Sequence, residues 1–333
     1  MTDIHSVALL GAGRIGSIHA ANIAAHDRSR LAYVVDPNRG AAEMLAARYG
    51  AGLADADTAM DDPDIAAIVI CSATPTHADF IERAAKAGKA VFCEKPIDLS
   101  QTRVRETLQA IEGSGAPLLV AFNRRFDPGL AALHRSVRAG EIGSVELVTV
   151  VSKDPGPPPI PYIKESGGLF RDMTIHDLDM ARFLLGEEPT HVHAAASNLV
   201  DPEIGEAGDI DTAVLTLETA SGRLAVITNS RRAVHGYDQR VEVHGSKGTL
   251  RTVNMPESTL VRDGEGGIVH AKPMHFFLER YAAAYRAEWD HFVDVLDGNA
   301  APLANGEDGL RALVLADAAY GSLESGARVA IPA

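Results

Sequence analysis

A glycine-rich turn between a strand and a helix constrains the fold of this chain more than any other feature. The residues GAGRIG at 11–16 follow the apolar run VALL and open the helical stretch IGSIHAANIAAH. Gly11 permits a tight turn, Gly13 lets the backbone approach a pyrophosphate, and Gly16 lets the helix pack closely on the strand. Asp36 follows the next β-branched run, where a carboxylate can bind ribose hydroxyls. The glycine pattern is weak by itself, but in this context it predicts a dinucleotide-binding unit.

The pattern of strands and helices changes once along the chain. From residue 5 to about 122, short β-branched runs alternate with helical stretches, which predicts a doubly wound parallel sheet. From 189 to 263, strand follows strand between short turns, which predicts an α+β domain on a large, mostly antiparallel open sheet. We therefore expect a dinucleotide-binding domain at 1–122 and a substrate-binding and oligomerisation domain at 123–333. The last helix is a candidate to pack back on the first domain.

Charge and composition exclude several classes of partner. The formal net charge of −14 argues against binding to nucleic acid or to an anionic membrane, because either partner needs a basic face. The longest apolar runs are too short to span a bilayer, and no basic segment followed by an apolar one marks a signal peptide. Cys71 and Cys93 lie in apolar, strand-like runs, as buried thiols of a reducing cytosol do. We therefore expect a cytoplasmic protein.

Two further motifs follow strands and are expected at the carboxyl-terminal edge of the parallel sheet. CSATPTH at 71–77 and EKP at 94–96 occupy the places where open α/β sheets bind ligands. Thr76 is equally consistent with a helix cap, and EKP alone is a weak signal. We expect the dinucleotide to contact Gly11, Ala12, Gly13, Arg14, Ile15, Asp36, Ser72, Thr74, His77, Glu94 and Lys95.

The carboxylate of Asp36 also predicts which dinucleotide is bound. It would hydrogen-bond the adenosine ribose and repel the 2′-phosphate of NADP, so the sequence favours NAD. Arg39 is the residue that argues the other way, since a nearby arginine can accommodate that phosphate.

The segment FRDMTIHDLDMARFLLG at 170–186 puts titratable residues on one side of an otherwise apolar helix. At about 100° per residue, Asp172, His176 and Asp179 share a narrow sector with Phe183, which we interpret as the buried or cleft-facing side. Leu178 falls near the opposite side. Buried carboxylates are costly unless they are paired or used. These residues fit either a catalytic group or a core histidine that is salt-bridged to Asp172 at i, i+4.

Six motifs in this order resemble the glucose–fructose oxidoreductase and inositol dehydrogenase family: GAGRIG, VVDP, SATPTHADF, EKP, NRRFDP and FRDMTIHDLDMARFLLG. The resemblance extends over about 5–325, and EKP and the Asp-x-x-x-His pair are its family-specific motifs. It implies a Rossmann domain, an α+β domain whose open sheet supports a homotetramer, and a substrate cleft between the two. It also implies a cis peptide bond between Lys95 and Pro96.

Matched position by position, Lys95, Asp172 and His176 fall on the family's catalytic lysine, aspartate and histidine. Oxidation of a secondary alcohol needs a base for the hydroxyl proton, and an imidazole with its ordinary pKa of about 6.5 suits that role. Asp172 would orient the ring and stabilise its protonated form, and Lys95 would stabilise the developing alkoxide. The resemblance places at the substrate Asn123, Arg124, Asp154, Asp172, His176, Asp179 and Tyr237.

The resemblance therefore implies NAD-dependent oxidation of a cyclic polyol, with myo-inositol and its 2-keto product scyllo-inosose as the leading pair. The alternatives are the same chemistry on another inositol isomer or a sugar, or an NAD-sensing protein without chemistry. Arg124 and Arg125 are also consistent with surface charges, and Asp154 with a turn former. We expect no metal site, because His191 and His193 share a strand face without a third ligand.

Overall fold

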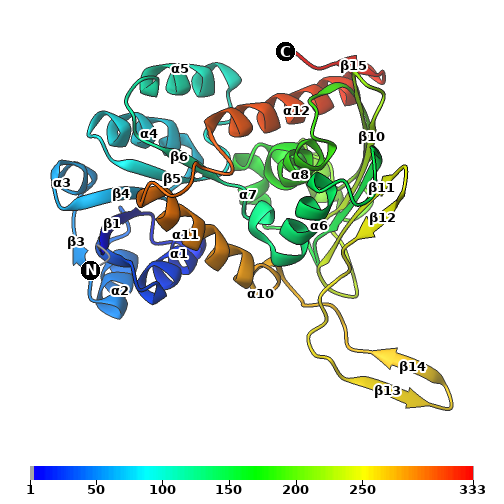
Figure 1. Cartoon of the computed structure of the whole chain (residues 1–333), viewed down its shortest axis with the longest axis horizontal. Coiled ribbons are helices and arrows are strands. Elements are labelled where there is room, and N and C mark those ends of the chain that lie inside the picture. The colour runs from blue at the N-terminus through cyan, green and yellow to red at the C-terminus, as the bar shows by residue number, and fades with distance from the viewer. Residues whose placement is uncertain (1–3, 333) are drawn as a thin grey trace. The chain divides into compact units, whose positions relative to one another are not determined.

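The computed structural model describes residues 4–332, and the contacts within it divide the chain into two compact units. The first unit takes the residues up to Phe126 together with Ala284–Arg311, and the second takes Asp127–Ala283 with the residues after Arg311. Each unit carries one large sheet (Figure 1). A segment late in the sequence therefore belongs to the unit that the beginning of the chain forms.

The first unit is built on six parallel strands in the order β3-β2-β1-β4-β5-β6. The winding direction reverses between β1 and β4, as it does in doubly wound sheets that bind dinucleotides. The strands are β1 (His5–Leu10), β2 (Ser29–Val35), β3 (Gly52–Leu53), β4 (Ile65–Ile70), β5 (Ala90–Glu94) and β6 (Leu118–Ala121). The helices are α1 (Arg14–Ala25), α2 (Arg39–Tyr49), α3 (Ala56–Asp61), η1 (Thr74–Thr76), α4 (His77–Lys86), α5 (Gln101–Ile111), η2 (Asn123–Phe126) and α11 (Ala282–Leu296). The predicted doubly wound parallel sheet is confirmed.

The core of this unit lies between the sheet and its helices. Val7, Leu9 and Phe92 are fully buried, because a parallel sheet between helix layers has no solvated face. α11 contributes Trp289, whose ring centroid lies 5.9 Å from that of Phe92 and whose indole N–H donates to the Ser29 hydroxyl. Fully burying one large apolar side chain stabilises a fold by about 1.5–3 kcal/mol. Burial of Trp289 thus ties the late segment to the first sheet.

The second unit is built on seven strands in the order β12-β11-β7-β10-β9-β8-β15. β7 and β10 pair in parallel, and the other neighbours pair antiparallel, so the predicted mostly antiparallel sheet is confirmed. The strands are β7 (Val145–Lys153), β8 (Pro189–Ser197), β9 (Thr212–Thr219), β10 (Leu224–Ser230), β11 (Asp238–Gly245), β12 (Gly248–Arg251) and β15 (Val329–Ala330). The helices are α6 (Pro128–Arg138), α7 (Ile160–Glu165), η3 (Phe170–Thr174), α8 (Ile175–Leu185), α9 (Pro202–Glu206), α10 (Phe277–Arg280) and α12 (Gly306–Ser325), whose first turns belong to the first unit.

One face of the seven-stranded sheet is covered and the other is open. α8 contacts β7 and β10 on the covered face. Along β9 and β10, buried residues alternate with more exposed ones, as in sheets with one solvated face. The open face carries the exposed apolar residues Val214 and Leu224. A separate hairpin of β13 (Val261–Gly264) and β14 (Gly267–His270) extends from this unit with all its residues exposed (Figure 1).

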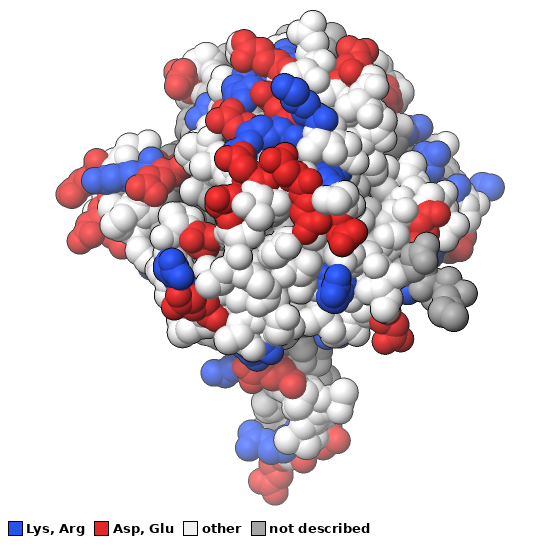
Figure 2. Space-filling model, turned by 90° about the vertical axis from the view of Figure 1, so that its left-hand side faces the viewer, with Lys and Arg blue, Asp and Glu red and all other residues white. Residues whose placement is uncertain are grey.

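Charged side chains of both signs are interspersed on the face shown in Figure 2. Between α4 and α5, for example, Arg103 pairs with both Asp79 and Glu82. This face does not present the continuous basic patch that nucleic acid requires. Within residues 4–332, no helix is long and apolar enough to cross a membrane.

Candidate active site

The carboxyl ends of β1, β2, β4 and β5 meet at one edge of the parallel sheet, and predicted cofactor residues follow each of them. Gly11 has a φ of 106°, a left-handed conformation that favours glycine. A Cβ at Gly11 would lie 2.4 Å from the carbonyl oxygen of Cys71, and a Cβ at Gly16 would lie 1.9 Å from that of Gly11. Both glycines are therefore required by the packing of this unit.

Gly13 differs from its neighbours, because a Cβ there would meet no protein atom within 4 Å. It is the N-cap residue of α1, it makes no side-chain cap, and the first turn of α1 contains no acidic residue. The amides of a helix N-terminus carry partial positive charge and bind phosphate. Protein packing does not need a glycine at 13, whereas a pyrophosphate lying against the backbone does. The residues of this turn therefore fit a dinucleotide.

Asp36 is held between the glycine turn and the turn after β2. Its Oδ2 accepts a hydrogen bond of 2.6 Å from the amide of Ala12, and its Oδ1 accepts one of 2.7 Å from the amide of Asn38. The carboxylate is thus fixed beside the glycine turn. Arg39 instead forms an exposed ion pair along α2, with its Nε 2.8 Å from Oε1 of Glu43.

His77 joins the loops that follow β4 and β5, and its side chain is almost fully buried. Its Nδ1 lies 2.8 Å from the carbonyl oxygen of Pro96, and its Nε2 lies 2.9 Å from that of Ser72. The Thr76 hydroxyl donates to the carbonyl of Ala73 and lies 2.6 Å from the Ser72 hydroxyl. His77 therefore positions the two loops from within, and Thr76 closes the 3₁₀ turn η1, which begins at Thr74.

Lys95 follows β5 directly and is half-buried. Its peptide bond to Pro96 is cis, which confirms the expectation from the resemblance. The neighbouring Glu94 turns its carboxylate to α1, with Oε1 2.8 Å from Nε2 of the buried His19. Glu94 therefore braces the helix whose first turn is expected to bind the pyrophosphate.

Sequence reasoning missed a second carboxyl group near Glu94. Glu288 on α11 is fully buried, and both its carboxyl oxygens lack a hydrogen-bond partner among the described residues. Burial raises the pKa of Glu288 well above its ordinary value, and the charge of Glu94 raises it further. Burial in a medium of low dielectric constant disfavours the charged form of a carboxyl group. A glutamate in an amphipathic helix pattern gives no sign of such burial.

The segment after β6 is buried rather than exposed. Asn123, Arg124 and Arg125 are each no more than 4% exposed. Arg125 donates to the carboxylate of Asp308 and to the carbonyl of Leu303. The alternative that Arg124 and Arg125 are surface charges is therefore wrong, because the turn η2 packs against residues that come much later in the chain.

In the second unit, Asp154, Arg231 and Tyr237 meet at one edge of the seven-stranded sheet. The parallel register of β7 and β10 places Asp154 and Arg231 just past neighbouring strand ends. β11 starts beside the end of β7, so Tyr237 lies at the same edge. Tyr237 is buried, and its ring centroid lies 5.9 Å from that of Tyr281.

The predicted catalytic helix is not a regular α-helix throughout. Phe170–Thr174 form a π-helical turn, η3, and α8 continues from Ile175 to Leu185. Asp172 lies in the π-helical turn and His176 in the first turn of α8, so the two residues do not belong to one regular α-helix. Such π-helical turns are rare and often occur at functional sites.

The polar stripe of this helix is partly exposed, as a cleft-facing side is, but the opposite side is buried as well. Leu178, expected near the outer side, is fully buried, whereas Asp172 and His176 on the polar stripe are partly exposed. The reason is tertiary packing, since α8 contacts β7 and β10 as well as α6. Solvent reaches the helix near Asp172 and His176, where a substrate can also approach.

The far end of the polar stripe has structural contacts. Asp179 is 1% exposed, and its Oδ1 lies 3.8 Å from a guanidinium nitrogen of Arg182, which also pairs with Glu188. Phe183 stacks on His134 of α6, with 3.6 Å between ring centroids. These contacts hold the second half of α8 in place.

The two oxygens of the Asp172 carboxylate face different partners. The Tyr162 hydroxyl of α7 donates to Oδ1 across 2.9 Å. A guanidinium nitrogen of Arg231 lies 3.8 Å from Oδ2, and Arg231 is only 1% exposed. Arg231 was not predicted, although an arginine directly after an apolar strand is a signal that sequence reasoning could have used.

A buried network ties the junction of η3 and α8 to the sheet. Asp177 is fully buried and accepts a hydrogen bond of 2.8 Å from the side-chain amide of Asn229 in β10. The hydroxyl of Thr174 donates to the amide oxygen of Asn229, also across 2.8 Å. Asp177 and Asn229 were missed as well, and a polar Asn within the β-branched run of β10 was their signal.

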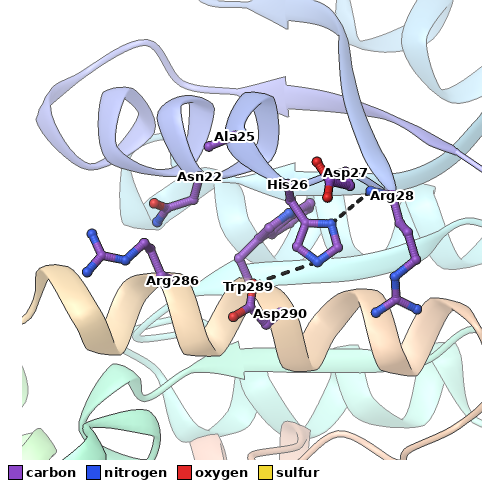
Figure 3. A pocket seen from close by; sticks show the side chains of 8 residues that line it. All are labelled: Asn22, Ala25, His26, Asp27, Arg28, Arg286, Trp289 and Asp290. Carbon is purple, nitrogen blue, oxygen red and sulfur yellow. Dashed lines mark hydrogen bonds and ion pairs between the residues drawn. The ribbon is translucent and has the colours of Figure 1, made fainter.

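A hollow of about 290 Å³ lies between α1 and α11 in the first unit (Figure 3). It is lined by Asn22, Ala25, His26, Asp27, Arg28, Arg286, Trp289 and Asp290. Nδ1 of His26 accepts from the amide of Arg28, and its Nε2 lies 3.7 Å from the carboxylate of Asp290. His26, Asp27 and Arg28 follow the end of α1 and precede β2, at the amino-terminal edge of the sheet. The hollow therefore lies at the edge opposite the glycine turn, where we expect the cofactor.

Two family profiles match the chain. One is described as an oxidoreductase family with an NAD-binding Rossmann fold and matches residues 5–122. The other is described as the GFO/IDH/MocA C-terminal domain and matches residues 130–251. Their ranges correspond to the dinucleotide-binding sheet and to the first part of the second unit.

The chain is similar to known proteins over nearly its full length. The inositol 2-dehydrogenase of Rhizobium meliloti (strain 1021) is 50% identical over 97% of this chain and 98% of its own. The crystal structure of a myo-inositol dehydrogenase from Corynebacterium glutamicum aligns with a TM-score of 0.95 at 42% identity and covers 99% of both chains. The scyllo-inositol dehydrogenase of Lactobacillus casei, with NAD(H) and scyllo-inositol bound, aligns with a TM-score of 0.91 at 31% identity, covering 98% of this chain and 99% of that one.

Proposed function

Because the chain belongs to the GFO/IDH/MocA family of NAD-binding oxidoreductases, we propose that it is an inositol dehydrogenase. It oxidises myo-inositol to the 2-keto compound scyllo-inosose and uses NAD as its cofactor, as a step of polyol catabolism. The observation that carries the proposal is that this chain is similar to inositol dehydrogenases over nearly its full length. The chain also contains Lys95, Asp172 and His176.

The cofactor lies along the carboxyl edge of the parallel sheet. Gly13 and the first amides of α1, which Arg14 and Ile15 contribute, hold the pyrophosphate, and Asp36 binds the adenosine ribose. Bound NAD accepts the hydride that leaves the substrate carbon. Lys95 extends from the end of β5 toward the reacting end of the site. Ser72, Thr74 and His77 shape the edge between these two ends.

Three side chains handle the proton and the developing charge. His176 in its neutral form accepts the proton of the substrate hydroxyl. A general base works best when its pKa lies near the operating pH. Asp172 orients the imidazole and stabilises it once it is protonated. Lys95 donates to the oxygen as alkoxide character develops there, which is where a preorganised cation contributes most.

A polyol is recognised by many hydrogen bonds, because a pocket built for hydroxyls rejects analogues that lack them. Asp154 and Tyr237 supply such groups from one edge of the second sheet, and Asp172 supplies one from η3. Asn123 and Arg124 add an amide and a cation after β6, and Asp179 binds a further hydroxyl.

The enzyme is a homotetramer of the cytosol. The open face of the seven-stranded sheet, with Val214 and Leu224 exposed, supports contacts between subunits. Burial raises the pKa of both thiols, Cys71 and Cys93, well above the ordinary value, so they resist oxidation and need no oxidising compartment.

Absorbance of NADH tests the function directly. Purified protein is mixed with NAD or NADP and with myo-, scyllo- or chiro-inositol, glucose or an anhydro sugar. We expect the highest kcat/KM with myo-inositol and NAD. No reduction of either cofactor with any of these compounds, by protein that binds NAD, would identify an NAD-sensing protein instead.

One observation favours a second substrate. The Lactobacillus casei relative holds scyllo-inositol, so the same chemistry on that isomer is the nearest alternative. The two isomers differ in the configuration of a single hydroxyl, and leaving its buried partner unsatisfied costs about 1–3 kcal/mol, or roughly 5–160-fold in kcat/KM. A higher kcat/KM with scyllo-inositol in the same assay would replace myo-inositol as the substrate.

A further inference from the structure

Arg231 is a buried cation for which the proposed chemistry has so far given no role. It follows the last residue of β10, and its side chain is 1% exposed. One terminal nitrogen lies 3.8 Å from Oδ2 of Asp172, the other lies 3.5 Å from Oδ2 of Asp209, and Nε is buried without a hydrogen-bond partner among residues 4–332. A guanidinium loses much hydration free energy on burial, so an imperfectly paired one is an unfavourable choice for stability alone. Stability alone therefore does not explain why this guanidinium is buried.

The position of Arg231 is fixed by the sheet rather than by Asp172. Its amide donates to the carbonyl of Asp211 across 2.9 Å. The carboxylate of Asp211 in turn accepts hydrogen bonds from the amides of three successive residues, 199–201. The cation is thus held at the end of β10. Asp172 lies on the less regular π-helical turn, so we infer that the charge of Arg231 positions the Asp172 carboxylate.

Arg231 acts on Asp172 by charge rather than by a direct hydrogen bond. At 3.8 Å the contact is an ion pair beyond hydrogen-bond distance, and burial of the guanidinium weakens solvent screening of its field. The hydrogen bond to Asp172 comes from Tyr162, whose side chain is about half exposed. A cation within about 4–6 Å favours the charged form of a carboxylate.

Several other groups contribute charge to this region. On the same helix they are His176, Asp177 and Asp179, and on the neighbouring elements they are Tyr162, Asp209, Tyr320 and the ion pair of Arg171 with Asp317. Arg171 and Asp317 neutralise each other through a contact of 2.7 Å, and the phenol of Tyr320 is uncharged at neutral pH because burial raises its pKa. Arg231 therefore forms ion pairs with both Asp172 and Asp209.

We propose that Arg231 is a positioning residue that holds the Asp172 carboxylate by its charge, and that this ion pair sets the pH above which His176 works as a base. The proposal rests on the proposed function and deepens it. Without the cation, Asp172 and His176 together hold a proton to higher pH, whichever of the two carries it. The dehydrogenase then needs more alkaline conditions to reach the same rate.

The test compares pH profiles of kcat/KM at saturating NAD for the parent and for three variants. Arg231→Met removes the charge but keeps much of the side-chain volume, and we expect its acid limb to move up by about one pH unit or more. Arg231→Lys keeps a cation and should restore most of the profile. Arg171→Met removes the arginine next to Asp172 in η3, which pairs with Asp317 instead. The acid limb of this variant should therefore stay in place.

A merely structural role predicts a different result. Loss of packing would lower kcat/KM by the same factor at every pH and leave the acid limb of Arg231→Met where the parent has it. That outcome overturns the proposal. Should Arg231→Met fail to fold, Asp209→Asn gives a second test, because it removes the competing anion and should move the limb to lower pH. An unmoved limb in that variant also contradicts the proposal.

Failure of the proposed function is distinguished by a readout that needs no substrate. The ring signal of His176 is assigned by its loss in His176→Ala and is followed by NMR through a pH titration. We expect its midpoint to lie higher in Arg231→Met than in the parent by a similar amount. A parent that reduces no NAD with any inositol but shows this shift rejects the substrate and keeps the role of Arg231. An unshifted midpoint rejects the role of Arg231.

Discussion

We expect the carboxylate of Asp36 to decide between NAD and NADP. Because both its oxygens accept backbone hydrogen bonds, the carboxylate cannot easily turn away. We expect it to lie where NADP would carry its 2′-phosphate. We predict at least a tenfold preference for NAD in kcat/KM, which requires only about 1.4 kcal/mol. Asp36→Asn keeps an acceptor for the Ala12 amide but removes the charge, and should erode the preference in assays with both cofactors.

The matched control for this variant is Arg39→Ala. The guanidinium of Arg39 pairs with Glu43 on an exposed helix face, so its loss should leave the ratio of NAD to NADP activity within about twofold, since an exposed pair is worth under 1 kcal/mol. Equal use of both cofactors by the parent protein would show that another group outweighs Asp36.

His176 carries the base chemistry in the proposed mechanism. Activity should rise with pH through the ionisation of its imidazole, because only the neutral ring accepts a proton. His176→Ala should keep its melting temperature and NAD affinity, since the partly exposed ring adds little to the core. Its kcat should fall by roughly 10²–10⁴-fold, the usual share of general-base catalysis. Steady-state rates and thermal melts on the same samples separate this result from loss of fold, and undiminished kcat in the folded variant would refute the mechanism.

At the scale of elements, two glycines of the turn before α1 are needed for different reasons. Gly16 is required by the packing of the protein, and we expect Gly13 to be required by the ligand. Gly16→Ala puts a Cβ 1.9 Å from the carbonyl oxygen of Gly11, so we predict a lower melting temperature and a loss of stability of about 1–3 kcal/mol. Gly13→Ala meets no protein atom, so its melting temperature without NAD should equal that of the parent.

NAD should distinguish the two variants further. At a concentration of about 100 times Kd, a ligand stabilises the folded state by about 2.7 kcal/mol, and the parent should show that rise in melting temperature. Gly13→Ala should lose most of it, because a methyl group occupies the place where the pyrophosphate meets the backbone. If Gly13→Ala keeps the full NAD-induced rise, the pyrophosphate is bound elsewhere.

At the scale of the whole molecule, Glu288 makes stability depend on pH. Its pKa in the folded state is raised by burial and by Glu94, so the unfolded chain releases a proton that the folded protein retains. The sign follows: folding stability is lost as pH rises above the unfolded-state pKa of about 4.3, by at most about 1.4 kcal/mol per pH unit until the folded-state pKa is reached. Glu288→Gln should therefore gain on the parent from pH 5 to pH 8 and match it near pH 4.

Denaturant unfolding of both proteins across this pH range measures the difference, because effects of all other groups cancel. A variant that is equally destabilised at every pH would mean that the amide fits poorly and that Glu288 does not retain a proton. A variant that loses stability relative to the parent as pH rises would mean that the buried carboxyl group is ionised.

The proposed tetramer depends on the open face of the second sheet. Val214 is 46% exposed on that face, and a lysine there would place a charge in a contact between subunits. We predict that Val214→Lys lowers the assembly mass in light scattering and analytical ultracentrifugation. Val234→Lys is the control, since Val234 is 90% exposed in the loop after β10 and outside the sheet. A tetramer that persists in Val214→Lys would locate the contacts elsewhere.

The sequence by itself determined the features that depend on local pattern. Alternation of strands and helices predicted the parallel sheet, strand after strand predicted the mostly antiparallel one, and the glycine spacing with Asp36 predicted the cofactor edge. The predictions of the two sheets succeed because residues close in the chain decide them, through side-chain periodicity and turn conformation. The cofactor edge stays a prediction. The order of motifs also indicated the family and placed the predicted catalytic residues.

Tertiary structure decided what depends on partners far apart in the chain. Burial of both faces of α8 follows from contacts with β7, β10 and α6, and no periodicity within the helix reveals it. The pKa of Glu288 is raised because α11 packs on the first sheet beside Glu94, and Arg231 at the end of β10 lies 3.8 Å from Asp172 of η3. The physical reason is common to all three: desolvation and Coulomb interaction depend on distance in space, whereas the sequence gives distance along the chain.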